Sequence, residues 1–182
     1  MFLISMISNS IDLMIIILVL IPAGLGLKSG LLRSIFSLAG ILAGLFLATR
    51  FNDKIISALI FLKMDPKLLS LISFIGVIIL CYFISVYIAG KISKLNAVTK
   101  TIDKFFGAVF GIAKGLIIAS LFLIFTTNTF SLFAKETINS SKLYPSVFNI
   151  APEVYDYLMK FFPDAKGFYD ELNKIIFTSS II

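Results

Sequence analysis

The sequence predicts an all-α membrane protein with four transmembrane helices and a C-terminal amphipathic helical region. The strongest observation is the run from Leu68 to Gly90, which contains no charged residue. A helix of that length crosses the ~30 Å hydrocarbon core of a bilayer. Composition agrees, because 59% of the residues are hydrophobic, only 14% are charged and the mean hydropathy is +1.04. A soluble domain carries about 25% charged residues, so this chain has too few to cover a soluble surface.

Four apolar blocks lie within residues 1–134, which we predict to be one transmembrane domain. The first block has a helix start signal, because Asn9 is followed by an acid, Asp12, three residues later. Pro22 lies inside it and predicts a kink or an early end. Only residues 28–30 separate the first two blocks, which indicates a tight helical hairpin. The predicted spans are residues 11–27, 31–49, 68–90 and 105–125.

The segments outside the spans also carry helical patterns. In the second connection, Ile55, Ile56 and Leu59 recur at helical spacing before Pro66, which favours a short interfacial helix.

The tail, residues 135–182, predicts two amphipathic helices that begin near Pro152 and Pro163. Their apolar faces include Val154 and Leu158 in the first helix, and Tyr155 is of a type favoured at membrane interfaces. Either these faces lie on lipid, as an interfacial tail, or they pack against the helix bundle.

The distribution of lysine and arginine predicts the orientation. The first and third connections are short and dense in basic residues beside the spans, with Lys28 and Arg33 at the first. Basic residues close to span ends favour the cytoplasmic side. We therefore predict a multi-pass protein of a bacterial inner membrane with both termini outside the cytoplasm, although lysines in the second connection argue for the reverse.

Small residues recur at a spacing of four in two predicted spans. A glycine stripe on one helix face lets a neighbouring backbone approach closely. Two interpretations remain open: both stripes pack inside one monomer, or one forms a homo-oligomer interface or lines a pore. The stripes are Gly107, Gly111 and Gly115 in the fourth block, and Gly40 and Gly44 in the second.

Lys114 lies within the glycine stripe of the fourth block. If that block begins at Phe105, the ammonium group lies near mid-membrane, where a charge costs at least ~2.5 kcal/mol. If the block begins later, Lys114 reaches the interface by extending its side chain, and we favour this second interpretation. Arg33 and Asp12 lie near helix ends, so reaching the interface and helix capping explain them.

The sequence predicts no enzyme. It contains no histidine, which excludes a serine–histidine pair and histidine metal ligands, and it has no phosphate-binding glycine loop. We therefore expect no catalytic residue, cofactor or metal. The basic residues flank apolar blocks instead of forming an aromatic-laced patch, so no nucleic-acid partner is expected. The expected partners are the lipid bilayer and either a second copy or other membrane proteins.

Four motifs follow one another along the chain: Ile11-Asp12 at the start of the first span, Gly26 to Arg33 at the hairpin, Asp103 to Gly115 in the fourth block and Ser141 to Pro145 before the tail. In this order they resemble the CvpA (colicin V production) family of bacterial inner-membrane proteins. The last three resemble its G-x-x-R-G-x-x-R hairpin, its D-R-x-x-G…G-x-x-R/K-G signature and its S-x-L-x-P segment. The resemblance covers residues 11–145.

This chain departs from the family pattern at the hairpin, where Lys28 and Ser29 replace the arginine before glycine and Ser34 stands where an acid is common. The resemblance implies a role in colicin V production or export and in envelope maintenance, without an established reaction. A channel or transporter subunit that conducts through a homo-oligomer is the alternative. The candidate packing or functional residues are Asp12, Gly30, Arg33, Gly40, Gly44, Asp103, Gly107, Gly111, Lys114, Gly115 and Pro145.

Overall fold

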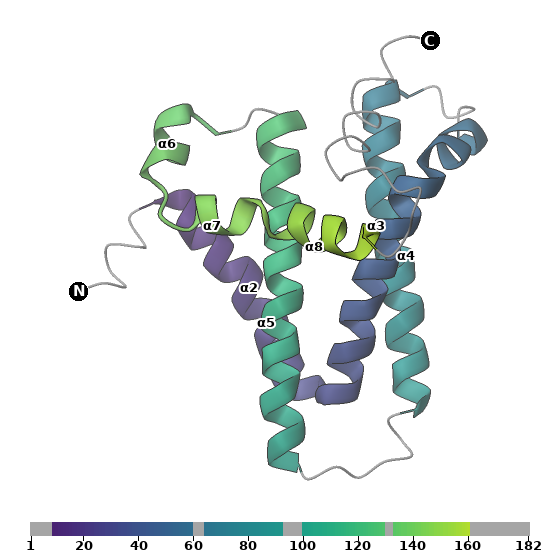
Figure 1. Cartoon of the computed structure of the whole chain (residues 1–182), viewed down its shortest axis with the longest axis vertical. Coiled ribbons are helices and arrows are strands. Elements are labelled where there is room, and N and C mark those ends of the chain that lie inside the picture. The colour runs from purple at the N-terminus through teal and green to yellow at the C-terminus, as the bar shows by residue number, and fades with distance from the viewer. Residues whose placement is uncertain (1–8, 60–63, 93–99, 130–132, 161–182) are drawn as a thin grey trace. The chain divides into compact units, whose positions relative to one another are not determined.

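The computed structural model describes residues 9–59, 64–92, 100–129 and 133–160, and every regular element among these residues is helical (Figure 1). Four of the helices are long and apolar enough to cross a membrane, which confirms the predicted fold class. The long helices are α2 (Ser10–Ser29), α3 (Leu31–Leu59), α4 (Pro66–Ile92) and α5 (Lys100–Ile124). A π-helical turn, η3 (Phe125–Thr129), and three short helices follow: α6 (Lys135–Ser140), α7 (Tyr144–Phe148) and α8 (Ile150–Met159).

Two elements differ from their predicted bounds. α2 begins with Asn9 as its N-cap, as predicted, but it continues through Pro22 to Ser29 without the early end that proline suggested. α3 continues to Leu59, beyond the apolar stretch that ends at Phe51, so the residues expected to form a separate interfacial helix continue the helix of the second span instead. Figure 1 shows the last turns of α3 bending away from the axis of the rest. The second predicted tail helix lies outside the described residues.

The chain divides into two compact units. The first comprises Met1–Ile35 and Ser93–Glu153, and the second comprises Phe36–Ile92 and Val154–Ile182. The boundary between them falls inside α8.

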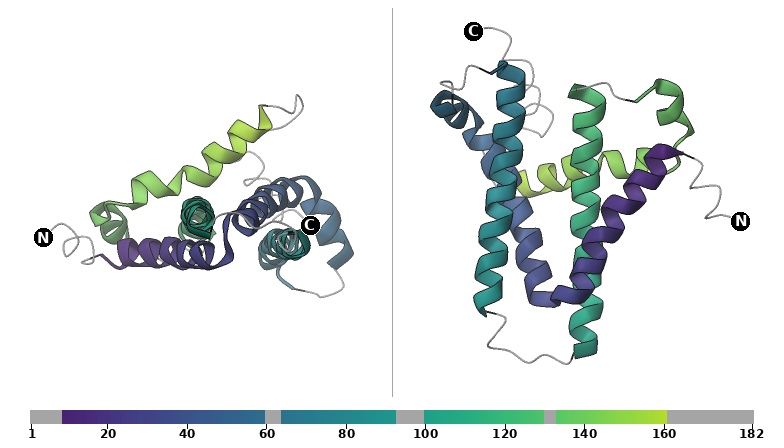
Figure 2. Two further views of the ribbon diagram at one scale, coloured as in Figure 1. Left: turned by 90° about the horizontal axis from the view of Figure 1, so that it is seen from below. Right: turned by 180° about the vertical axis from the view of Figure 1, so that it is seen from behind.

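In the first unit, α2 lies beside α5 and runs in the opposite direction (Figure 2). The core of this unit gathers where the N-terminal part of α2 meets the C-terminal part of α5. Val147 of α7 joins it, so the segment after the fourth span covers this end of the helix pair. The buried residues of this core are Ile11, Ile15, Ala119, Leu123 and Val147.

In the second unit, α3 packs against α4 through its small residues, and the end of α8 contributes buried side chains. Ile41, Leu45 and Ala48 on α3 are buried, as are Phe74 on α4 and Tyr155 on α8. Tyr155 is therefore buried, which favours the second of the two expectations, packing against helices instead of lipid. Three buried positions of α8, Ala151, Tyr155 and Met159, recur every four residues, whereas Val154 and Leu158 are only partly buried.

Large apolar side chains cover the outer faces of the long helices. Leu20, Leu80, Phe83 and Phe105 each expose more than 60% of their surface. Such faces are unfavourable in water and suit contact with lipid acyl chains.

Candidate functional site

The glycine stripe of α5 packs against α2. A Cβ atom built on Gly111 would lie 2.9 Å from the Cα of Ala23, and one on Gly115 would lie 2.8 Å from the Cα of Val19. At Gly107 the added carbon would overlap the carbonyl oxygen of Gly26. Backbone atoms surround all three positions, so only glycine permits this approach. In the first unit the stripe therefore contacts another helix of the same chain.

The stripe of α3 makes the same kind of contact in the second unit. A Cβ atom on Gly40 would lie 2.6 Å from Oγ of Ser85, and one on Gly44 would lie 2.8 Å from the Cα of Ile78. Both glycines therefore let α4 approach α3 closely. The structure places both predicted stripes between helices of one chain.

Asp103, at the start of α5, holds the hairpin turn between α2 and α3. Its Oδ1 accepts a hydrogen bond of 2.7 Å from the backbone N–H of Leu31, the first residue of α3. That amide is one of the N–H groups that a helix cannot satisfy internally, so Asp103 caps a helix far from it in sequence.

Gly30 makes room for this carboxylate. Its φ of 81° lies in the left-handed region, which favours glycine. A Cβ atom at this position would also overlap the carboxylate of Asp103. Two residues from separate predicted motifs thus form one junction.

Asp12 forms a second junction at the opposite end of α2. Its side chain is only 1% exposed. The hydroxyl of Ser141 donates to Oδ1, and the backbone N–H of Leu143 donates to the same oxygen at 3.0 Å. The N–H of Lys142 donates to Oδ2 at 3.2 Å. Capping of its own helix therefore does not explain Asp12, because its carboxylate binds the connection between α6 and α7.

Asn9 strengthens the same junction. Its Oδ1 accepts from the N–H of Ile11, which caps α2, while its Nδ2 donates to the carbonyl oxygen of Thr137 and to Oγ of Ser140. The side chains of Asn9 and Asp12 thus both bond the start of α2 to the end of α6 or to the residue that follows it.

Ser120 of α5 forms a third junction with the chain between α7 and α8. Its hydroxyl donates to the carbonyl oxygen of Phe148 at 2.6 Å and accepts from the N–H of Ala151 at 2.9 Å. The side chain is fully buried. In the second unit, Oγ1 of Thr49 on α3 lies 2.9 Å from the hydroxyl oxygen of Tyr155 on α8.

Lys114 lies halfway along the apolar stretch Ile102–Thr127 of α5 and is only 5% exposed. The helix begins at Lys100, so the later start that would bring Lys114 to the interface is not observed. A lysine near the middle of a span that faces protein instead of lipid is a functional candidate, because burying its charge is costly.

The remaining predicted residues lie at the surface. Arg33, in the first turn of α3, is exposed, in agreement with a side chain that reaches the interface. Pro145 is exposed and occupies the second position of α7, where its missing N–H leaves no intrahelical bond unmade. Neither side chain joins the junctions.

Sequence reasoning missed the partners of these junctions. In the sequence Ser141 begins a motif and Tyr155 is of an interfacial type, whereas Ser120 and Thr49 are distinguished only as polar residues in apolar surroundings. A hydroxyl in an apolar segment could have been recognised as a junction residue, because a buried hydroxyl requires a hydrogen-bond partner. Among the residues that the structure describes, no group of acids and cysteines is arranged to hold a metal ion.

The chain matches a known protein family. The profile of the family described as "Colicin V production protein" matches residues 11–152. The matched region begins at the start of α2 and ends inside α8, so it includes all three junctions of the first unit. Neither the curated proteins nor the solved structures contain a match.

Proposed function

Because the chain belongs to the colicin V production protein family, we propose that it is a non-enzymatic inner-membrane component. In this proposal it supports colicin V production or export and the maintenance of the envelope. Its termini lie outside the cytoplasm, and its partners are lipid and other membrane proteins or a second copy of itself.

The observation that carries a non-enzymatic role is the use made of the carboxylates in the first unit. Asp12 and Asp103 both lie in motifs of the family, and both accept hydrogen bonds from backbone N–H groups of another segment. A carboxylate engaged in this way fixes the fold and is not available as a general base. In these motifs Asp12 and Asp103 therefore hold helices and connections together.

Toxin measurements in cells test this proposal. A colicin V-producing strain that lacks its own member of the family should release little toxin, and expression of this chain should restore toxin in the medium. Toxin retained inside the cells without the chain would indicate export, and loss both inside and outside would indicate production. Equal toxin in the medium with and without the chain would contradict the proposal.

A channel or transporter subunit is the second candidate, and Lys114 is the observation that favours it. A buried lysine in a membrane span often marks an ion or substrate path. Liposomes that contain only this protein should show anion or proton flux if it conducts by itself. Flux that disappears in Lys114→Met would favour this candidate, and liposomes as tight as protein-free ones would favour the first.

A further inference from the structure

We propose that the segment formed by α7 and α8 lies in the headgroup layer of the membrane, and that its exposed face binds lipid headgroups. The hydrocarbon-crossing part of α5 then ends near Ser120, and residues 121–129 project beyond the hydrocarbon. This assignment is independent of the role in toxin production.

The direction of the segment is the first observation. Within the first unit, α7 and the start of α8 run crosswise to α5 in both side views (Figures 1 and 2). If α5 crosses the membrane, an element crosswise to it lies parallel to the membrane plane. The hydrogen bonds of Ser120 to Phe148 and Ala151 fix the depth of this element on α5.

The lengths of two helices of the first unit give the second observation. Asp12 on α2 is bonded to the connection just before the segment, and Ser120 on α5 is bonded to the segment itself. Each lies about 17 to 20 residues from the far end of its helix, which is roughly 26 to 30 Å at ~1.5 Å per residue. That length matches the ~30 Å hydrocarbon core.

The full apolar stretch of α5 is longer than the hydrocarbon core is thick. Its 26 residues, Ile102–Thr127, correspond to roughly 39 Å of helix. A stretch of that length exceeds the hydrocarbon core, so either the helix is tilted or part of the stretch lies outside, and the proposal takes the second. The buried side chains of Leu121, Leu123 and Ile124 show that protein covers one face of the projecting part, while Phe122 is exposed on another.

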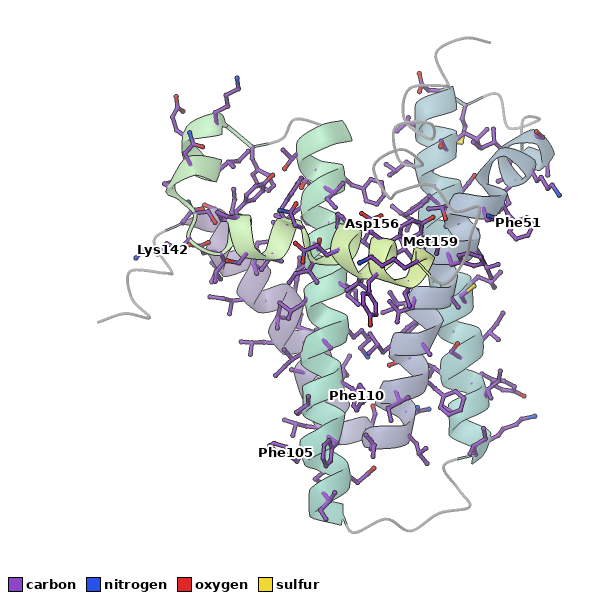
Figure 3. The ribbon with its side chains drawn as sticks, in the orientation of Figure 1. Phe51, Phe105, Phe110, Lys142, Asp156 and Met159 are labelled. Carbon is purple, nitrogen blue, oxygen red and sulfur yellow. The ribbon has the colours of Figure 1, made fainter. Side chains whose placement is uncertain are left out.

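Charges provide the third observation. Lys142 and Glu153, on or beside α7 and α8, are exposed, and Figure 3 shows the Lys142 side chain pointing away from the helices. Lys135 and Glu136 on α6 are also exposed, and α6 lies beyond α7 toward the C-terminal end of α5 (Figure 1). If hydrocarbon extended to Thr127, the exposed Lys142 and Glu153 beside α7 and α8 would lie in it, and a lysine at the centre of a span costs about 2.5–3.5 kcal/mol.

The exposed face of α8 suits the headgroup layer. Tyr157 is 61% exposed, and Nζ of Lys160 lies 5.7 Å from the centre of its ring. A tyrosine beside a lysine anchors a helix where apolar and polar lipid regions meet. The opposite face carries the buried residues Ala151, Tyr155 and Met159 and packs on protein.

Cysteine labelling tests the depth with two matched positions on α5. Phe122 and Ile112 are exposed to 41% and 43%, so burial by protein does not distinguish them. Each cysteine is introduced into a Cys81→Ser background, and the protein is reconstituted into vesicles that are opened so that the reagent reaches both sides of the membrane. Phe122→Cys should then react with a membrane-impermeant maleimide. Ile112→Cys should stay unlabelled, because the reactive thiolate does not form in hydrocarbon. Protection of both positions would overturn the proposal.

A tryptophan reporter provides an independent measurement. The chain has no tryptophan, so Tyr157→Trp supplies a single fluorophore. Lipids brominated near the headgroup should quench it more strongly than lipids brominated near the chain end. Stronger quenching by the deep label, or none by either, would contradict the placement of α8.

Discussion

At the scale of single residues, two carboxylates accept hydrogen bonds near the two ends of α2 and hold neighbouring segments there. Asp103 caps α3 from α5, and Asp12 accepts bonds from the α6–α7 connection. Both were candidates from sequence motifs, but their partners could not be inferred. Ser141 is 129 positions from Asp12, and no spacing rule links residues so far apart. Asp12 resembled an ordinary capping residue because it lies in the first turn of a helix.

Asp12→Asn should destabilise the protein. The amide retains one acceptor but turns an N–H₂ group toward donors, so at least one of the three bonds is lost. Hydrogen bonds to a charged group contribute about 1.5–3 kcal/mol, and a loss of that order should lower the thermal midpoint in detergent. Glu136→Gln on the exposed surface of α6 is the matched control and should leave the midpoint unchanged. Equal thermal midpoints for both variants would refute the claim that the Asp12 carboxylate stabilises the fold.

Lys114→Met tests the buried lysine. Methionine fills much of the same volume without the charge, so the protein should accumulate to the normal level. Toxin release in the complementation assay should fall if the charge is functional, and Lys114→Arg should retain part of it because the family pattern accepts either base. Full complementation by Lys114→Met at an unchanged protein level would exclude the charge from function.

At the scale of elements, the existence and order of the four spans could be predicted, because long apolar runs can be satisfied only as helices in a membrane. The extent of α3 could not, since an amphipathic extension and a separate interfacial helix have the same periodicity. The inward face of α8 could not be predicted either. Val154 and Leu158 are more apolar than Ala151, but contacts with other helices decide which stripe is buried.

Gly111→Ala should weaken the packing of α2 on α5. The added methyl group would lie 2.5 Å from the carbonyl oxygen of Pro22, which is too close for a carbon atom. Overpacking of this kind costs about 1–3 kcal/mol. Gly24→Ala is the control, because nothing lies within 4 Å of its added carbon. Thermal midpoints in detergent should fall for Gly111→Ala only, and an equal response would contradict the close-packing account.

At the scale of the whole molecule, membrane residence followed from composition, and the family match agrees with it. Orientation rests on charge counts alone, because the described helices are consistent with either direction. The junctions make the orientation testable. In the first unit they place Gly30 and the Asp12 carboxylate at opposite ends of one antiparallel helix pair.

The central claim is that α2 and α5 cross the bilayer side by side, with the Asp12 end outside the cytoplasm. Lys28 and Lys142 are exposed at opposite ends of this pair, which makes them suitable label sites. In a Cys81→Ser background, Lys142→Cys should react with an impermeant maleimide in intact spheroplasts, and Lys28→Cys should react only after the membrane is opened. A reversed pattern would overturn the orientation, and labelling of both positions from one side would contradict the crossing itself.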